Sequence, residues 1–150
     1  MSSACLQPVP RQIPQKTLHR VAQERTTPVR ILIADHQSAV RSAVRLLLEE
    51  RLELDVVGEA ANSQELLAQL EHLRPDIILL DWDLPGGSTV DLLDAFRRLN
   101  RQPRVIVLGT YPELGQAARA ASADAFVSKG DPPRRLLTAV RALAAEDQRE

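Results

Sequence analysis

The sequence has one cysteine, few aromatic residues and no long apolar run, and each shortage excludes a class of protein. The single cysteine, Cys5, leaves no partner for a disulfide within the chain. No segment is apolar over the length that a bilayer requires, and the first residues lack the apolar core of a signal peptide. We therefore expect a cytoplasmic protein that makes no membrane contact.

The sequence also lacks a large excess of positive or negative charge. The net charge is -1, and no stripe of Lys and Arg alternates with aromatic residues. This composition does not favour a nucleic-acid surface, so we expect no direct contact with nucleic acid. Neither G-x-G-x-x-G nor G-x-x-x-x-G-K-[ST] occurs, which weighs against a dinucleotide site and against a phosphate-cradling loop.

The composition that is present indicates one domain with an aliphatic core. The chain has 150 residues, of which 44% are hydrophobic and 3% aromatic. Residues 1–28 are rich in proline and more basic than acidic, which predicts a flexible arm. We expect the folded domain to span residues 29–145 and a polar tail to follow at 146–150.

Two apolar runs end at carboxylates. Residues 77–80 form an unbroken apolar run after Asp76 and stop at Asp81, as in a parallel strand that is covered on both faces. A second run, residues 29–34, ends at Asp35. Shorter runs predict strands at residues 54–57, 104–108 and 125–127.

Helical patterns follow the strands. Asn62 and Glu65 have the spacing of a capping pair, and Asp131 with Pro132 is expected to open the last helix. The helix expected at 112–121 offers little apolar surface, so it is the one expected to move most readily. The expected buried positions are Val40, Val44, Leu47, Leu48, Leu66, Leu70, Leu73, Val90, Leu93, Phe96, Leu99, Leu114, Leu136, Leu137, Val140 and Leu143.

Five strands alternating with five helices predict a flavodoxin-like three-layer α/β/α sandwich with a parallel sheet in the order 2-1-3-4-5. In this order the first and third strands are neighbours, so Asp35 and Asp81 should meet. The fourth and fifth strands should carry Thr110 and Lys129 to the same rim. Carboxylate oxygens favour Mg²⁺, and a lysine can neutralise a phosphoryl group.

Four motifs in this order resemble those of response-regulator receiver domains, the CheY-like family of two-component phosphorelay signalling. They are ILIAD at 31–35, DIILLDWDLPGG at 76–87, VIVLGT at 105–110 and AFVSKG at 125–130. The resemblance covers Val29 to about Ala145. It implies that Asp81 accepts phosphate from a histidine kinase or a phosphotransfer protein, and that Lys129 pairs with the phosphoryl group.

The same resemblance implies a metal site and a switch. Asp35, Asp81 and the main-chain carbonyl of Trp82 would hold Mg²⁺, and Phe126 matches the aromatic residue whose rotamer reports activation. Asp83 is a further candidate ligand, with exposure to solvent as the alternative.

The sequence departs from the family pattern at two positions. His36 replaces the second of two adjacent acids, which should weaken Mg²⁺ binding because a neutral imidazole suits softer metals. Gly109 replaces a hydroxyl residue, which should weaken the coupling between the phosphoryl group and Phe126. Thr110 would restore the hydroxyl only after a local bulge or slip, since side chains alternate along a strand.

The resulting hypothesis is a stand-alone receiver that switches a protein–protein interaction. Its expected contact face comprises the helix at 112–121, the strand at 125–127 and the last helix, and a homodimer is a further possibility. The chain would not be an enzyme, except that it would catalyse its own phosphorylation and dephosphorylation. The alternative is a pseudo-receiver, an interaction module in which His36 and Gly109 have removed efficient phosphotransfer.

Overall fold

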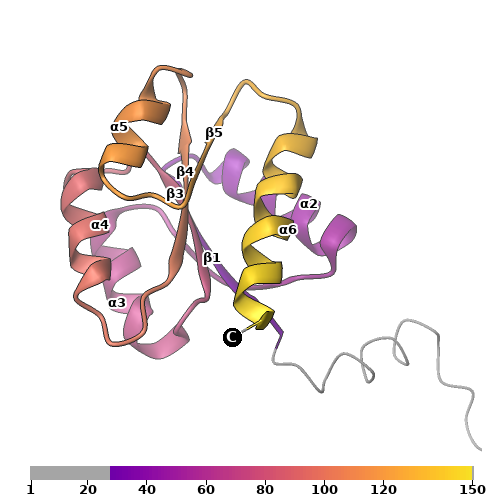
Figure 1. Cartoon of the computed structure of the whole chain (residues 1–150), viewed down its shortest axis with the longest axis horizontal. Coiled ribbons are helices and arrows are strands. Elements are labelled where there is room, and N and C mark those ends of the chain that lie inside the picture. The colour runs from indigo at the N-terminus through magenta and orange to yellow at the C-terminus, as the bar shows by residue number, and fades with distance from the viewer. Residues whose placement is uncertain (1–27, 150) are drawn as a thin grey trace, which may run out of the picture.

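The structure, a computed structural model, describes residues 28–149. Almost all of the arm expected at residues 1–28 lies outside this part of the chain. A five-stranded parallel sheet with the order β2-β1-β3-β4-β5 forms the middle layer (Figure 1). The predicted fold and strand order are confirmed.

Strands and helices alternate along the chain. The strands are β1 (Arg30–Ala34), β2 (Asp55–Ala60), β3 (Ile77–Asp81), β4 (Arg104–Gly109) and β5 (Ala125–Ser128). The helices are α2 (Ser38–Leu52), α3 (Ser63–Leu73), α4 (Thr89–Arg97), α5 (Leu114–Ala120) and α6 (Pro133–Arg149). None of these helices is both long and apolar enough to cross a membrane.

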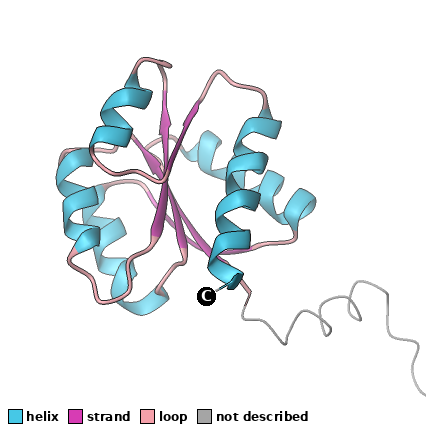
Figure 2. Cartoon of the chain, in the orientation of Figure 1, coloured by secondary structure: helices cyan, strands magenta, loops and turns pink. Residues whose placement is uncertain are grey.

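Helices cover both faces of the sheet, with α2 and α6 on one side and α3, α4 and α5 on the other (Figure 2). Each central strand therefore needs apolar side chains in both directions, which explains its unbroken apolar sequence. Ile31, Ile33, Ile77 and Leu79 face the α2 and α6 side, and Leu32, Ala34, Ile78 and Leu80 face the other. All eight are fully buried.

The prediction of which residues of α4 are buried was partly wrong. Val90 is 51% exposed and Leu99 is 37% exposed, whereas Leu92, Leu93 and Phe96 are buried. The helix is capped by the Ser88 side chain, which accepts a hydrogen bond from the Asp91 N–H, and it ends at Arg97. Leu99 therefore lies beyond the helix, and Val90 lies about 100° from the buried stripe.

The last two helices also differ from their expected bounds. The short helix α5 begins at Leu114 rather than at Pro112, and α6 begins at Pro133. The Asp131 carboxylate accepts a hydrogen bond from the Ser128 N–H, upstream of α6, so it holds the preceding turn instead of capping the helix as expected. α6 continues past residue 145, and Arg104 pairs with Glu146 at 2.9 Å.

Other local expectations are confirmed. The Asn62 side chain accepts a hydrogen bond from the Glu65 N–H at 2.9 Å, and the Glu65 carboxylate accepts one from Ala61. Leu66 and Leu70 of α3 are buried. The α6 stripe is buried as well, at Leu136, Leu137, Val140 and Leu143.

The turn after β3 depends on a glycine. Gly86 has a φ of +101°, and a Cβ there would lie 2.3 Å from the Ser63 Oγ. The Ser63 N–H donates to the Pro85 carbonyl at 2.8 Å, so this turn joins the loop after Asp81 to the start of α3.

Gly86→Ala should lower the free energy of unfolding by about 1–2 kcal/mol, because an L-residue at this φ is strained. Urea denaturation would measure the change. Gly87→Ala is the matched control, because its φ is not positive and the nearest atom to its Cβ, the Ser63 Oγ, is 3.8 Å away. Equal losses in the two variants would contradict this account of the turn.

Candidate functional site

Backbone hydrogen bonds hold the carboxyl ends of the strands together. The Asp35 N–H donates to the Ala60 carbonyl at 3.0 Å, and the Lys129 N–H donates to the Gly109 carbonyl at 2.7 Å. The Trp82 N–H donates to the Leu108 carbonyl at 2.8 Å. These bonds continue the sheet beyond the strands and fix the rim on which the predicted site residues lie.

Two carboxylates and one ammonium form the centre of the site. Asp35 and Asp81 are fully buried. The Lys129 Nζ lies 2.9 Å from the Asp35 Oδ2 and 3.2 Å from the Asp81 Oδ1. The structure therefore brings together the three residues that the strand order was expected to gather.

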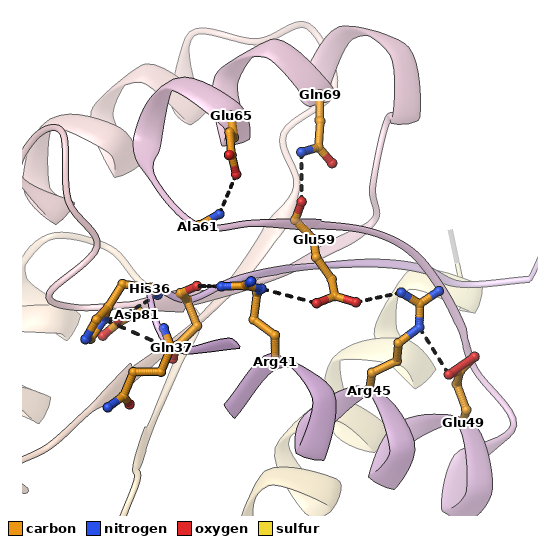
Figure 3. A network of polar contacts seen from close by, with 11 residues as sticks. His36, Gln37, Arg41, Arg45, Glu49, Glu59, Ala61, Glu65, Gln69 and Asp81 are labelled. Carbon is orange, nitrogen blue, oxygen red and sulfur yellow. Dashed lines mark hydrogen bonds and ion pairs between the residues drawn. The ribbon is translucent and has the colours of Figure 1, made fainter. Parts of the chain in front are cut away.

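His36 lies on the other side of the carboxylates. Its Nδ1 is 2.6 Å from the Asp81 Oδ2 and 3.8 Å from the Asp35 Oδ1. The imidazole contacts Asp81 at the left of Figure 3. The His36 side chain is 42% exposed, so the carboxylates are enclosed between a largely buried ammonium and a partly exposed imidazole.

Main-chain donors complete the surroundings of the carboxylates. The Gln37 N–H donates to the Asp35 Oδ1 at 2.8 Å, and the Asp83 N–H donates to the Asp81 Oδ1 at 3.0 Å. Burial acts to raise the pKa of Asp81, but the hydrogen bonds from His36 and Asp83 and the charge of Lys129 lower it below its ordinary value. Asp81 is therefore ionised near neutral pH.

Lys129 responds to the same surroundings in the opposite direction. Burial acts to lower the pKa of its ammonium, but Asp35 and Asp81 outweigh this effect and raise the pKa above its ordinary value. The ammonium is thus charged throughout the physiological range, and its charge offsets part of the negative charge of the two buried carboxylates.

Sequence reasoning missed a polar network beside the site. The Arg41 Nη1 donates to the Asp35 carbonyl at 2.6 Å, and its Nε donates to Glu59 at 3.2 Å. Glu59 also accepts a 2.6 Å bond from Arg45 (Figure 3). Arg41 and Arg45 appear in the sequence only as polar positions of a helix, so their spacing gave no signal of this contact.

Two expected metal ligands also make hydrogen bonds within this structure. The Trp82 carbonyl accepts a 2.7 Å hydrogen bond from the Thr89 hydroxyl at the start of α4. Asp83 is exposed and contributes its N–H to Asp81. Among the described residues, the group of side chains close enough to share a metal ion comprises Asp35, His36 and Asp81.

The Phe126 ring fills the space beside Gly109. A Cβ on Gly109 would lie 2.8 Å from the Phe126 Cε2, and a Cβ on Gly115 would lie 3.3 Å from its Cδ1. The ring therefore packs between β4 and α5, against two residues that have no side chain. Sequence reasoning treated Gly109 only as a lost hydroxyl and did not foresee this packing.

Thr110 lies outside this arrangement. β4 pairs in unbroken register with both neighbours, including Asp81 with Leu108 and Gly109 with Ser128, and Thr110 is exposed. The bulge that Thr110 would need to replace the missing hydroxyl is absent from this strand.

Comparison with known proteins identifies the class to which this fold and site belong. A family model described as the response regulator receiver domain matches residues 31–141. The chain belongs to this family. It is the receiver domain of a response regulator, the class of protein that operates in two-component signalling.

Several curated proteins are similar over most of this chain. The nitrate/nitrite response regulator protein NarL of Escherichia coli is 32% identical over 120 residues, which cover 79% of this chain and 56% of NarL. The related NarP is 34% identical over 119 residues, which cover 77% of this chain and 55% of NarP. The chain thus spans about half the length of these relatives.

Solved structures agree with this assignment. A CheY-like receiver domain protein from Methanospirillum hungatei matches with a TM-score of 0.72 and 27% identity over 82% of this chain and 98% of its own. A LuxR-family two-component response regulator from Aurantimonas matches with a TM-score of 0.73 and 28% identity over 80% of this chain and 87% of its own.

The lowered pKa of Asp81 predicts a dependence of stability on acid. Because the folded-state pKa lies below the ordinary value of 3.8, ionised Asp81 stabilises the fold above that pH. This contribution is lost as the pH falls through the folded-state pKa. Asp81→Asn should therefore flatten the fall in urea midpoint between about pH 5 and pH 2. Asp83→Asn, at the exposed neighbour, should keep the wild-type slope, and an unchanged slope in Asp81→Asn would contradict the prediction.

The packing of Phe126 predicts that Gly109 tolerates no side chain. Gly109→Ala should cost about 1–3 kcal/mol of stability, because the new Cβ overlaps the ring. The cost should shrink markedly in a Phe126→Ala background, which a double-mutant cycle of urea denaturation would measure. Gly130→Ala is the control, since its Cβ would have no neighbour closer than 3.8 Å. The same cost in both backgrounds would show that the ring is not the obstacle.

Proposed function

We propose that this receiver domain accepts a phosphoryl group on Asp81 from a histidine kinase or a phosphotransfer protein and changes a protein contact in response. The observation that carries the proposal is the Asp81 carboxylate, which ends the central strand with Lys129 at 3.2 Å. An ionised oxygen is a nucleophile, and a charged amine beside it can stabilise the charge that a phosphoryl group brings.

In the proposed reaction one Asp81 oxygen forms the new bond to phosphorus while the donor's bond to phosphorus breaks and its electron pair leaves with the donor. Lys129 is held by Asp35 as well as by Asp81. It can therefore remain in the site and move its hydrogen bond from the Asp81 oxygen to a phosphoryl oxygen.

Receiver domains generally use Mg²⁺ for this reaction, and the donor set here fits that ion in part. Asp35 and Asp81 would hold the ion, which when bound supplies positive charge to the phosphoryl oxygens. The Trp82 carbonyl, which the family resemblance implies as a ligand, also accepts a hydrogen bond from the Thr89 hydroxyl, and its second lone pair remains for a cation. Asp83, proposed as a substitute ligand, has an exposed side chain.

The proposed output face comprises α5, β5 and α6. It contains a hollow of about 450 Å³ between β5 and α6, lined by Phe126, Val127, Asp131, Arg134, Arg135, Thr138 and Ala139. This hollow reaches Phe126 beneath α5, so a change in α5 or in the ring would alter its shape. A downstream protein is the proposed occupant, and a second copy of the chain is the alternative.

The proposed function also includes the bounds of the receiver domain and the expectation that it makes no direct contact with nucleic acid. We assign the receiver to residues 29–145, preceded by an arm and followed by a polar tail, although α6 continues into that tail. The RcsB protein of Salmonella is 26% identical and has been solved bound to promoter DNA, but the match covers only 62% of that chain. The expected lack of direct nucleic-acid contact therefore concerns the receiver residues alone.

One observation favours the alternative function, a pseudo-receiver that binds partners without efficient phosphotransfer. The His36 Nδ1 lies 2.6 Å from the Asp81 Oδ2, so the acceptor is already engaged. The Phe126 ring also occupies the space beside Gly109 in which a hydroxyl side chain would lie, so this route of coupling to α5 would be missing.

Acetyl phosphate with a divalent ion separates the two functions. The receiver should gain one phosphoryl group, seen as an adduct by intact mass, and Asp81→Asn should abolish it because the variant lacks the proposed acceptor carboxylate. Asp83→Asn should retain the adduct. An adduct that persists in Asp81→Asn would refute the assignment, and the absence of any adduct in the wild-type protein with Mg²⁺, Mn²⁺ or Co²⁺ would favour the pseudo-receiver.

A further inference from the structure

We propose that the metal site of this chain selects a divalent transition ion that accepts nitrogen, such as Co²⁺ or Zn²⁺, in preference to Mg²⁺, with His36 as a direct ligand. The inference concerns the site of the proposed function but does not depend on phosphoryl transfer. It starts from a disagreement between the donor atoms that the site presents and those that Mg²⁺ prefers.

The donor atoms divide into two groups across the carboxylates. The Asp35 Oδ2 and the Asp81 Oδ1 face the Lys129 ammonium at 2.9 and 3.2 Å. The Asp35 Oδ1 and the Asp81 Oδ2 lie 3.8 and 2.6 Å from the His36 Nδ1. A cation bound away from Lys129 therefore meets one oxygen of each carboxylate together with the imidazole.

Burial makes these carboxylates strong candidates for a cation. Asp35 and Asp81 are both fully buried, and the Lys129 ammonium faces one oxygen of each. One ammonium offsets only one of the two negative charges. Unpaired buried charge is costly, so the site favours a second positive group on the His36 side.

The third donor decides which cation fits. Mg²⁺ demands oxygen ligands in a nearly regular octahedron, and it binds imidazole poorly, whereas imidazole suits Zn²⁺, Ni²⁺ and related ions. The Asp83 side chain is exposed, and the Trp82 carbonyl already accepts one hydrogen bond, from Thr89 at 2.7 Å, which leaves it one lone pair. Two carboxylate oxygens and one imidazole nitrogen thus make a three-ligand set with open positions, as in zinc sites that keep a solvent ligand.

The His36 side chain can also adjust to an ion without opening the core. It is 42% exposed, while its main-chain N–H already points toward the Asp81 Oδ2 at 3.4 Å. A nitrogen-accepting ion would replace the hydrogen bond between the Nδ1 and the Oδ2 with two bonds to the metal. Mg²⁺ would instead have to displace the imidazole from Asp81 and gain nothing from it.

Calorimetric titration with Co²⁺ or Mg²⁺ alone, without any phosphodonor, tests the selectivity. We expect the ratio of Co²⁺ to Mg²⁺ affinity to fall at least about tenfold from the wild-type protein to His36→Asp, because the carboxylate improves Mg²⁺ binding and removes the nitrogen ligand. His36→Gln should weaken Co²⁺ binding without improving Mg²⁺ binding. His72→Gln, which removes an exposed histidine at the end of α3, is the matched control and should keep the wild-type ratio.

A second measurement observes the ligand itself. Zn²⁺ should shift the imidazole ¹⁵N resonance of the His36 Nδ1, assigned by its loss in His36→Gln, and Mg²⁺ should not. An unchanged affinity ratio in His36→Asp, or an Nδ1 resonance that Zn²⁺ leaves in place, would overturn the inference. Neither readout requires an adduct on Asp81, so failure of the proposed function and failure of the metal inference are distinguishable.

Discussion

The rest of the site depends on the burial of two carboxylates at adjacent strand ends. Asp35 and Asp81 have no exposure to solvent, and charges in such a place are stable only when they are paired and hydrogen-bonded. Lys129 supplies the charge, at 2.9 and 3.2 Å, and the N–H groups that follow each aspartate supply hydrogen bonds. The bond from the Lys129 N–H to the Gly109 carbonyl fixes the main chain from which the ammonium reaches the two carboxylates, so the position of this charge depends on the sheet.

The strand order and the centre of the site could be predicted because both follow from the backbone. Parallel strands place their carboxyl ends at one edge, so the position of Asp35, Asp81 and Lys129 in the sequence was enough to bring them together. The buried face of α4 could not be predicted as well, since an error of one residue rotates a helix by 100°. The contact of Thr89 with the Trp82 carbonyl depends on where that helix begins, and the spacing of Ser88 and Asp91, which is typical of a helix cap, could have indicated that start.

Contacts that depend on side-chain rotamers could not be predicted from the sequence either. The motif around Gly109 indicates that a hydroxyl is missing, but it does not indicate what fills the space. The structure shows that the Phe126 ring does, and that Gly115 of α5 accommodates its other edge. The missing side chain therefore has two consequences: residue 109 has no side chain to reach a phosphoryl group, and the Phe126 ring fills the space between β4 and α5. Both features support the proposal of weak coupling between Asp81 and the proposed output face.

Access to Asp81 depends on the one neighbour that can move at low cost. Lys129 has a side chain that is only 18% exposed and bonds to both carboxylates, so its departure would leave two buried charges without compensation. His36 is 42% exposed and makes its close contact with Asp81 alone. Its displacement breaks one hydrogen bond and leaves the ion pairs with Lys129 intact. A phosphodonor, or an ion that prefers oxygen ligands, must therefore compete with the imidazole for the Asp81 Oδ2. An ion that binds nitrogen can instead leave the imidazole in the site as a ligand. Under the proposed function, the strength of this imidazole–carboxylate contact would therefore help to decide whether Asp81 accepts a phosphoryl group or the domain acts as a pseudo-receiver.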